Sequence, residues 1–458
     1  MSRAILALAS TLWVALCIFP AFAQQRNETT TKPALQDQSP AGDDQMNMPG
    51  MNMPTKLVDK YLMQQASGTG VNPQSAPMEM LTKRIKSWTL RFHGLTFINE
   101  VQQTGPRGGD KFFSTNWFMG MAEHRAGSGS LLFRAMTSLE PATATERRYP
   151  ELFQTGETAF GKPIVDGQHP HDFVMELSMQ YAMRLGEKTI MDLYLAPVGD
   201  PALGPVAFPH RISAAELPQA ALSHHLQDST HIADEVITAG LARGMMRLEA
   251  SGFHGGEPNE NRWNMDHGAV DSWSARLTLT PSENWSGQVS VGRLKRPEVL
   301  DSTDIVRSTA SVTYNKPLPS GHWASSLIWG RNHKTANHSN INSYLAESVF
   351  QFQQKNYLTG RIELVDKDEL LDDQFGIQSG INQPLGLPVG SVFRIAAFTL
   401  GYTRDFSLLP GIQTGFGGNF TLYRIPSAIR PLYGDRPSSV IVYLRFRLKG
   451  NAPAQHNH

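Results

Sequence analysis

The stretch Asp172–Leu185 alternates apolar and polar residues over an unusually long run. A period of two places the two sets of side chains on opposite faces of one extended strand. Strands of soluble domains are mostly about 5–6 residues long, whereas a tilted membrane-spanning strand needs about 9–11. The pattern therefore fits a transmembrane barrel or a long strand of a soluble β-sandwich. The apolar set is Phe173, Met175, Leu177, Met179, Tyr181, Met183 and Leu185.

Residues 1–23 have the parts of a secretory signal peptide. Arg3 supplies the positive start, Ala4–Phe19 is apolar, and Ala21–Ala23 fits the small-x-small cleavage pattern. The mature chain is expected to begin at Gln24. A lipoprotein signal that uses Cys17 is the alternative, although the residues just before this cysteine fit it less well.

Cys17 is the single cysteine, and cleavage after residue 23 removes it. The mature protein then has no disulfide, thiol nucleophile or cysteine metal ligand. After the signal, no apolar run approaches the about 20 residues that a membrane helix needs, so entry into a membrane would require a barrel. Lys+Arg and Asp+Glu both number 41, which argues against a general nucleic-acid-binding protein.

Residues 24–86 are expected to form a flexible, Met-rich periplasmic arm. Its first part is rich in Thr, Gln, Asn, Pro, Gly and Asp and has few large apolar residues, so it cannot bury enough surface to offset the entropy of ordering. Lys56–Gln65 is the exception, and we predict a short helix there.

Alternating segments separated by turn residues recur from Ser87 onward. We count about sixteen of them, roughly 14–18, a number at which a closed sheet can enclose a lumen. The connections alternate between short and long, which is typical of an outer-membrane barrel and not of a sandwich. The predicted fold is all-β: a transmembrane antiparallel up-and-down β-barrel over residues 87–449, with long outer loops, short periplasmic turns and a C-terminal tail at 450–458.

Residues 87–449 resemble a Gram-negative outer-membrane β-barrel of the porin-like kind. The terminal segment SSVIVYLRFRL is similar to the aromatic-containing closing strand that such proteins present to the barrel-insertion machinery, although Gly450–His458 follows it here. The resemblance implies a cell outer membrane, contact with lipid and passage of small solutes. It leaves open the oligomeric state and whether the lumen is open or plugged.

The inward positions of the predicted strands carry many charges, and the tryptophans lie near strand ends or within strands. A mixed set of charges fits a water-filled or a plugged interior. We expect Glu176, Glu249, Glu347 and Glu363 to pair with arginines that include Arg134, Arg184, Arg247, Arg276 and Arg361. The tryptophans, among them Trp117, Trp273 and Trp285, are expected in interfacial girdles.

Histidines concentrate in or beside the predicted long loops. Imidazole and carboxylate suit zinc, copper(II), nickel or iron. The sequence lacks a recognised zinc motif such as HExxH, and the alternative is that these side chains only hydrogen-bond within ordered loops. The candidate metal ligands are His169, His171 and Asp172 in HPHD, and His224, His225 and His231.

The arm contains the segment MNMPGMNMP. Thioether sulfur is soft and favours copper(I), and the alternative is a low-complexity linker with incidental methionines. The segment resembles the methionine-rich segments of bacterial copper-resistance proteins. That resemblance implies copper(I) ligands at Met46, Met48, Met51 and Met53.

Motifs of common enzymes are missing: there is no G-x-S-x-G, P-loop or dinucleotide fingerprint. Ser223 stands beside His224 with Asp228 nearby, which keeps a surface hydrolase as a minor alternative. We expect no catalytic residues and no required cofactor. The predicted function is an outer-membrane barrel that passes or handles metal ions, with copper favoured, in tolerance or uptake. The main alternative is a general diffusion porin.

Overall fold

The computed structural model describes residues 57–371, 381–382, 385–388 and 390–450. The chain divides into two units, Met1–Met51 and Asn52–His458, and every described residue belongs to the second. None of the helices in these described ranges is long and apolar enough to cross a membrane, a finding that concerns helices only. The predicted signal peptide, Met46–Met53 and residues 451–458 lie outside the described residues.

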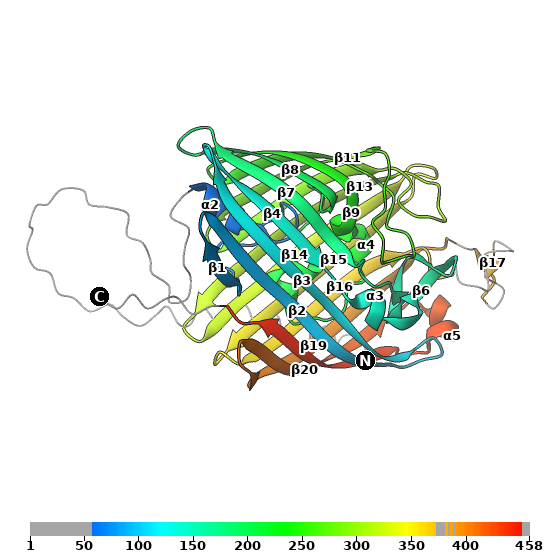
Figure 1. The fold of residues 1–458 in the computed structure, drawn as a ribbon. Helices are drawn as coiled ribbons and strands as arrows, with labels where there is room; N and C mark the ends of the chain where they lie inside the picture. The colour runs from blue at the N-terminus through cyan, green and yellow to red at the C-terminus, as the bar shows by residue number, and fades with distance from the viewer. Residues whose placement is uncertain (1–56, 372–380, 383–384, 389, 451–458) are drawn as a thin grey trace, which may run out of the picture. The chain divides into compact units, whose positions relative to one another are not determined.

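A closed antiparallel barrel forms most of the described chain (Figure 1). Seventeen strands belong to one sheet, and sixteen of them close the barrel because β21 pairs with β2. The predicted fold and strand number are therefore confirmed. The barrel strands are β2 (Trp88–Gln103), β3 (Asp110–Ala126), β4 (Gly129–Thr137), β7 (Val174–Arg184), β8 (Thr189–Gly199), β9 (Ala233–Arg243), β10 (Met246–Phe253), β11 (Ser272–Ser282), β12 (Trp285–Leu294), β13 (Ile305–Leu318), β14 (Gly321–Lys334), β15 (Asn340–Phe352), β16 (Asn356–Lys367), β19 (Phe393–Leu409), β20 (Ile412–Arg424) and β21 (Ser438–Leu448).

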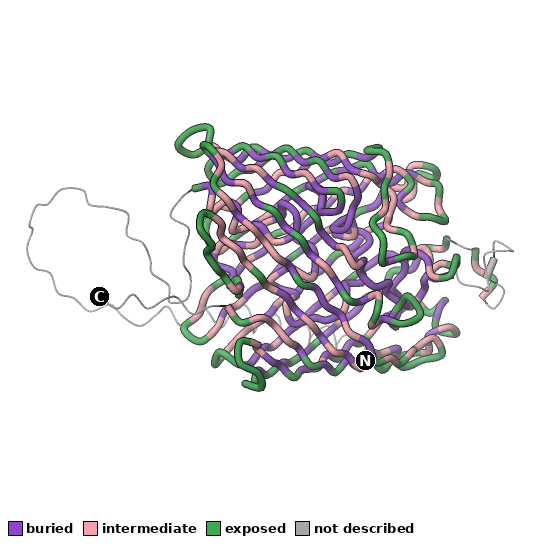
Figure 2. The backbone as a smooth tube through the Cα atoms, in the orientation of Figure 1, coloured by how far each residue is buried: buried purple, intermediate pink, exposed green. Residues whose placement is uncertain are grey.

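The two faces of each strand differ as the alternation predicts (Figure 2). On β7, Leu177 and Met179 are exposed on the outside, whereas Glu176 and Gln180 are buried in the interior. Met175 was expected on the apolar face but is fully buried, because the register with β4 shifts at this point. An apolar exterior around a polar interior is the surface of a transmembrane barrel.

Connections of different length separate the two ends of the barrel (Figure 1). We call these ends the long-loop end and the short-turn end. The turns are 127–128, 185–188, 244–245, 283–284, 319–320, 353–355 and 410–411, and the longer connections are 104–109, 138–173, 200–232, 254–271, 295–304, 335–339, 368–392 and 425–437. The longer connections contain α3 (Glu140–Thr143), η2 (Thr145–Arg147), β5 (Tyr149–Ala159), β6 (Lys162–Gln168), β17 (Ile381–Asn382), β18 (Leu387–Pro388), η6 (Ser427–Ile429) and α5 (Arg430–Tyr433).

The 200–232 segment folds into the barrel and reaches the opposite wall. Arg211 donates to Glu347 on β15 at 2.6 Å, and the hydroxyls of Ser213 and Ser326 on β14 lie 2.6 Å apart. Most of the segment is buried, so it fills this part of the lumen. Its short helices are η3 (Phe208–His210), η4 (Ile212–Ala214), α4 (His224–Gln227) and η5 (Ser229–Ile232).

The 57–80 segment also lies in the lumen, which corrects the prediction of a flexible arm up to residue 86. The Tyr61 hydroxyl donates to Asp192 on β8 at 2.6 Å, and the Ser75 hydroxyl donates to the carbonyl oxygen of Asn315 on β13 at 2.9 Å. The polar composition that favoured disorder instead suits hydrogen bonding to a polar barrel wall. The predicted short helix is confirmed as α2 (Leu57–Met63).

β1 (Leu81–Ile85) extends the barrel at the short-turn end. It pairs with residues 88–92 of β2, whereas β21 pairs with residues 95–103 along the same strand. These two ladders share one side of β2, so β1 continues the side that β21 leaves uncovered.

Buried ion pairs line the interior as predicted. Arg134 and Glu176 approach to 3.1 Å, and Arg276 and Glu249 to 3.1 Å. Burial makes these pairs necessary, because a buried charge without a partner costs several kcal/mol. Arg184 departs from the prediction: it lies at the exposed end of β7 and donates to the carbonyl oxygen of Gly186.

Replacing Arg211 by leucine should loosen the 200–232 segment and raise the ion conductance of the barrel. Arg211 also donates to Asp228 at 2.8 Å, so the variant leaves two buried carboxylates without this guanidinium. Breaking such a pair costs about 3–5 kcal/mol. Conductance of the refolded protein in a planar bilayer measures the effect, with Arg243→Leu at the exposed end of β9 as the control. Parental conductance in a folded Arg211→Leu barrel would contradict the docked arrangement.

Candidate metal centre

Two loops at the long-loop end bring five histidines together inside the barrel. His169 and His171 follow β6, His224 and His225 lie on α4, and His231 lies on η5. All five side chains are buried. We call this set the histidine cluster. Its ring centroids lie 5.6 Å apart for His169 and His225, 5.1 Å for His224 and His225, 5.3 Å for His224 and His231, and 5.4 Å for His171 and His231.

Local geometry explains how these rings meet. The two histidines of HPHD contact different partners: the His169 ring contacts His225, and the His171 ring contacts His231. The positive φ of +122° at Gly156 favours glycine. Its backbone also passes so close to the His225 ring that a Cβ atom there would lie 2.5 Å from the ring. Glycine therefore allows the β5–β6 hairpin to pack against the cluster.

Three of these rings can converge on one ion. Nitrogen atoms of His169, His224 and His225 all lie within 4.8 Å of one another. Ligand nitrogens around a tetrahedral ion with bonds of 2.0–2.1 Å are about 3.3 Å apart, so small side-chain movements would complete the site. His225 also belongs to a second group with the carboxylates of Glu257 and Glu298, whose ligand atoms meet the same 4.8 Å limit.

Several buried ring nitrogens in the cluster have no hydrogen-bond partner among the described residues. They are Nε2 of His169, both ring nitrogens of His225 and Nε2 of His231. Glu157 approaches His169 at 3.0 Å and Glu257 approaches His225 at 3.5 Å, but neither contact has hydrogen-bond geometry. Buried polar atoms are nearly always paired, and an ion or water is one reason for an exception.

Burial also sets the protonation of the cluster. Desolvation lowers the pKa of His224 to about 4, despite the opposing effect of Asp228. It lowers the pKa of His225 and that of His231 well below the usual range. These three rings are therefore neutral at pH 7, the form that binds a metal. Desolvation raises the pKa of Glu257 and of Glu298, so a nearby cation would favour their ionised forms.

Carboxylates orient two of the histidines through the Nδ1 atom of each ring. The Asp228 carboxylate lies 2.7 Å from Nδ1 of His224, and Glu140 lies 2.9 Å from Nδ1 of His171. A carboxylate on one ring nitrogen fixes the ring and leaves the other nitrogen for a metal. Each of the two rings can thus present Nε2 to the centre of the cluster.

Asp172 is the predicted ligand that the structure does not bring into the histidine cluster. Its carboxylate instead accepts a hydrogen bond from Arg262 at 3.2 Å. Glu298 was not predicted as a ligand, because no local sequence pattern marks it. It comes close to Glu257 because the connections 254–271 and 295–304 are joined there: the backbone N–H of Glu257 donates to the carbonyl oxygen of Pro297 at 2.9 Å.

The Ser223 hydroxyl lies 3.2 Å from Oε1 of Gln227 and 3.2 Å from Oε1 of Glu363, and its single hydrogen is donated to one of them, whereas His224 uses Nδ1 for Asp228. Ser223 is fully buried. These contacts do not make the serine–histidine pair of a hydrolase.

Comparisons with protein-family models and with curated protein sequences find no match. Solved structures of similar architecture include the anion-selective porin from Comamonas acidovorans, with 10% identity and a TM-score of 0.48 over 79% of this chain and 100% of the porin. The outer membrane channel DcaP of Acinetobacter baumannii has 8% identity and a TM-score of 0.46 over 80% of this chain and 100% of DcaP. OmpT of Vibrio cholerae has 8% identity and a TM-score of 0.45 over 80% and 99%. At these identities, the likeness concerns architecture alone.

Replacing His224 by glutamine should make the stability of the metal-free protein less dependent on pH. His224 titrates at about 4 when folded and near 6.5 when unfolded, so between these values the unfolded chain binds more protons and stability falls with falling pH. Glutamine cannot take up this proton. Relative to the variant, the parent should lose on the order of 1–2 kcal/mol between pH 7 and pH 5.

Urea unfolding in detergent with a chelator present measures this difference at the two pH values. Comparing variant with parent cancels the opposing contributions of buried acids that do not interact with His224, such as Glu151. The exposed His267 gives the matched control, His267→Gln, which should follow the parent. Equal pH dependence in His224→Gln and the parent would contradict a depressed pKa at His224.

Proposed function

We propose that this protein is a porin-like barrel of a Gram-negative outer membrane that binds a transition-metal ion inside its lumen, in metal tolerance or uptake. The observation that carries the proposal is the convergence of His169, His224 and His225, with ring nitrogens within 4.8 Å of one another. The ring nitrogens without a hydrogen-bond partner and the lowered pKa of His225 support the proposal, because a neutral imidazole with a free nitrogen can bind a cation.

The donor set suits a divalent ion of intermediate softness. Imidazole nitrogens with neighbouring carboxylates are ligands for zinc, copper(II), nickel and iron. Glu257 and Glu298 lie close enough to His225 to contribute negative charge. Copper is the metal we favour, since MNMPGMNMP resembles methionine-rich segments of copper-resistance proteins.

The histidine cluster lies where metal binding could affect the passage of ions through the barrel. Ligands come from the connections 138–173, 200–232, 254–271 and 295–304, all at the long-loop end. The 200–232 segment occupies the lumen, so an ion bound at the cluster would lie inside the barrel. In the proposed orientation the long loops are outside the cell, and the exterior of the barrel contacts lipid.

Metal titration of the refolded, metal-stripped protein tests the proposal. Zinc(II), nickel(II) and copper(II), each added alone, should reveal a site that His225→Gln weakens at least about tenfold, because even supporting residues of metal sites contribute that much. His267→Gln should bind as the parent does, since His267 is exposed and pairs with Glu235 outside the cluster. A folded parent that binds none of the three ions would overturn the proposal.

Conductance separates a metal-responsive barrel from a general diffusion porin. Copper(II) should change the conductance of the parent in a planar bilayer and leave that of His225→Gln unchanged. Conductance of the parent that is indifferent to copper would favour the general porin.

A further inference from the structure

A second group of metal-ligand side chains lies on the barrel wall, outside the histidine cluster. His93 on β2, Met119 on β3 and Met136 on β4 occupy one row across three adjacent strands, because His93 pairs with Met119 and Met119 with Met136. His210 of η3 completes the group from the 200–232 segment. Three members are thus held by strand pairing and the fourth by the docked segment.

Each imidazole of this group faces a sulfur atom. Nε2 of His93 lies 3.2 Å from Sδ of Met119, and Nε2 of His210 lies 3.2 Å from Sδ of Met136. The two ring centroids are 6.5 Å apart. A nitrogen and a sulfur on one tetrahedral ion, with bonds of 2.0–2.1 and 2.3 Å, are separated by about 3.5 Å. Both pairs are therefore close to the spacing of ligands that share an ion.

Hydrogen bonding alone explains the imidazole–sulfur contacts poorly. Thioether sulfur is only a weak hydrogen-bond acceptor, yet it is the partner that two partly buried imidazoles face. Met119 and Met136 are 3% and 2% exposed and belong to one hydrophobic cluster with Leu95 and Trp117. The Trp117 ring contacts both His93 and His210, with centroids 4.9 and 4.3 Å away. Trp117 therefore packs against the group from the inside of the barrel. The prediction that Trp117 lies in an interfacial girdle is wrong.

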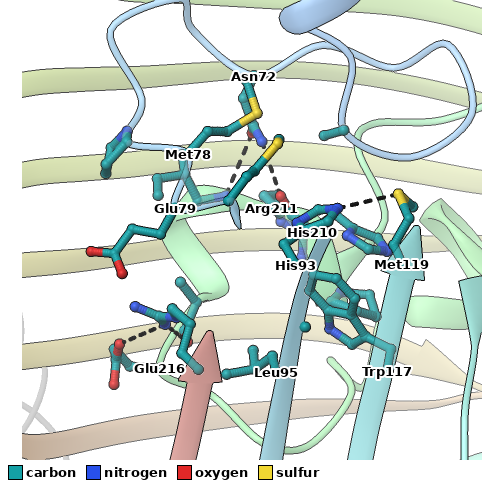
Figure 3. Close-up of a pocket in the computed structure, with 18 of the residues that line it drawn as sticks. Asn72, Met78, Glu79, His93, Leu95, Trp117, Met119, His210, Arg211 and Glu216 are labelled. Carbon is teal, nitrogen blue, oxygen red and sulfur yellow. Dashed lines mark hydrogen bonds and ion pairs between the residues drawn. The ribbon is translucent and has the colours of Figure 1, made fainter. Parts of the chain in front are cut away.

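A cavity of about 150 Å³ adjoins the group (Figure 3). His93, Met119 and His210 line it together with further methionines at Met78, Met80 and Met121. Other lining residues, His322, Gln351, Tyr357 and Arg447, lie next to short turns or near the strand end at the short-turn end of the barrel. The cavity thus lies in the half of the lumen away from the long loops, and it is large enough for several water molecules.

We propose that His93, Met119, His210 and Met136 form a binding site for a soft monovalent cation, copper(I), which enters from the short-turn end. Thioether sulfur selects copper(I) over the divalent ions that suit the histidine cluster. Imidazole and thioether are uncharged ligands. They suit copper(I), because a singly charged ion requires less compensating negative charge than a divalent one. Arg134 also lines the cavity, two residues before Met136 in the sequence. Its positive charge is neutralised by Glu176 at 3.1 Å. This site goes beyond the proposed function and does not depend on the histidine cluster.

The test uses the full mature chain with Met46, Met48, Met51 and Met53 replaced by leucine, so that arm methionines contribute nothing. Copper(I) is supplied without oxygen as its bicinchoninate complex, and transfer to the protein is followed by the loss of colour. This background should still take up copper(I). Adding Met119→Leu and Met136→Leu, which preserve side-chain volume, should weaken uptake at least tenfold. Met179→Leu on the exterior is the matched control.

X-ray absorption of the loaded background protein should show both nitrogen and sulfur around copper. No uptake by the folded background protein, or equal uptake after Met119→Leu and Met136→Leu, would overturn the proposal. Failure of this site is distinguishable from failure of the histidine cluster, because binding of zinc(II) by the cluster should survive both leucine substitutions and be weakened by His225→Gln.

Discussion

The interior of this barrel depends on ionic contacts between its wall and the segments that fill it. Sixteen strands enclose more space than wall side chains can occupy, and the inward positions carry charges that are costly to bury alone. The 200–232 and 57–80 segments supply the partners: Arg211 pairs with Glu347, Arg445 on β21 pairs with Glu216, and Thr69 bonds to Glu249. The docked segments therefore complete a neutralisation that pairs within the wall, such as Arg134–Glu176 and Arg276–Glu249, begin.

The filling also determines what chemistry the interior can support. Histidines on exposed loops would be partly protonated near pH 6.5, whereas the docked 200–232 segment holds His224 and His225 away from water and neutral. The same segment carries His210 to a row of thioethers on the wall. One loop thus presents imidazole to carboxylates near the long loops and to sulfur near the short turns, two environments that favour ions of different softness.

Sequence patterns predicted the periodic strands and the residues that share one end of the barrel. They missed the contacts that depend on strand register or on the docking of a segment in the lumen. Period-two alternation located the barrel strands, and the shared end of the long loops predicted that His169 would meet His224 and His225. The His93–Met119–Met136 row depends on pairing between strands, which residue spacing does not specify. The 57–80 segment was mistaken for a flexible arm because a polar sequence looks the same whether its partner is water or a polar wall.

The short strand β1 has a consequence for the barrel as a closed object. β2 is longer than its closing partner, and without β1 the backbone groups of residues 88–92 would form an open sheet edge beside the seam. Such an edge is a template on which another chain can add a strand. β1 occupies it, and its Lys83 and Arg84 side chains are exposed. The open edge at the seam thereby passes to β1, a strand of five residues with two cationic side chains. Short, charged edges of this kind resist pairing with a neighbouring molecule.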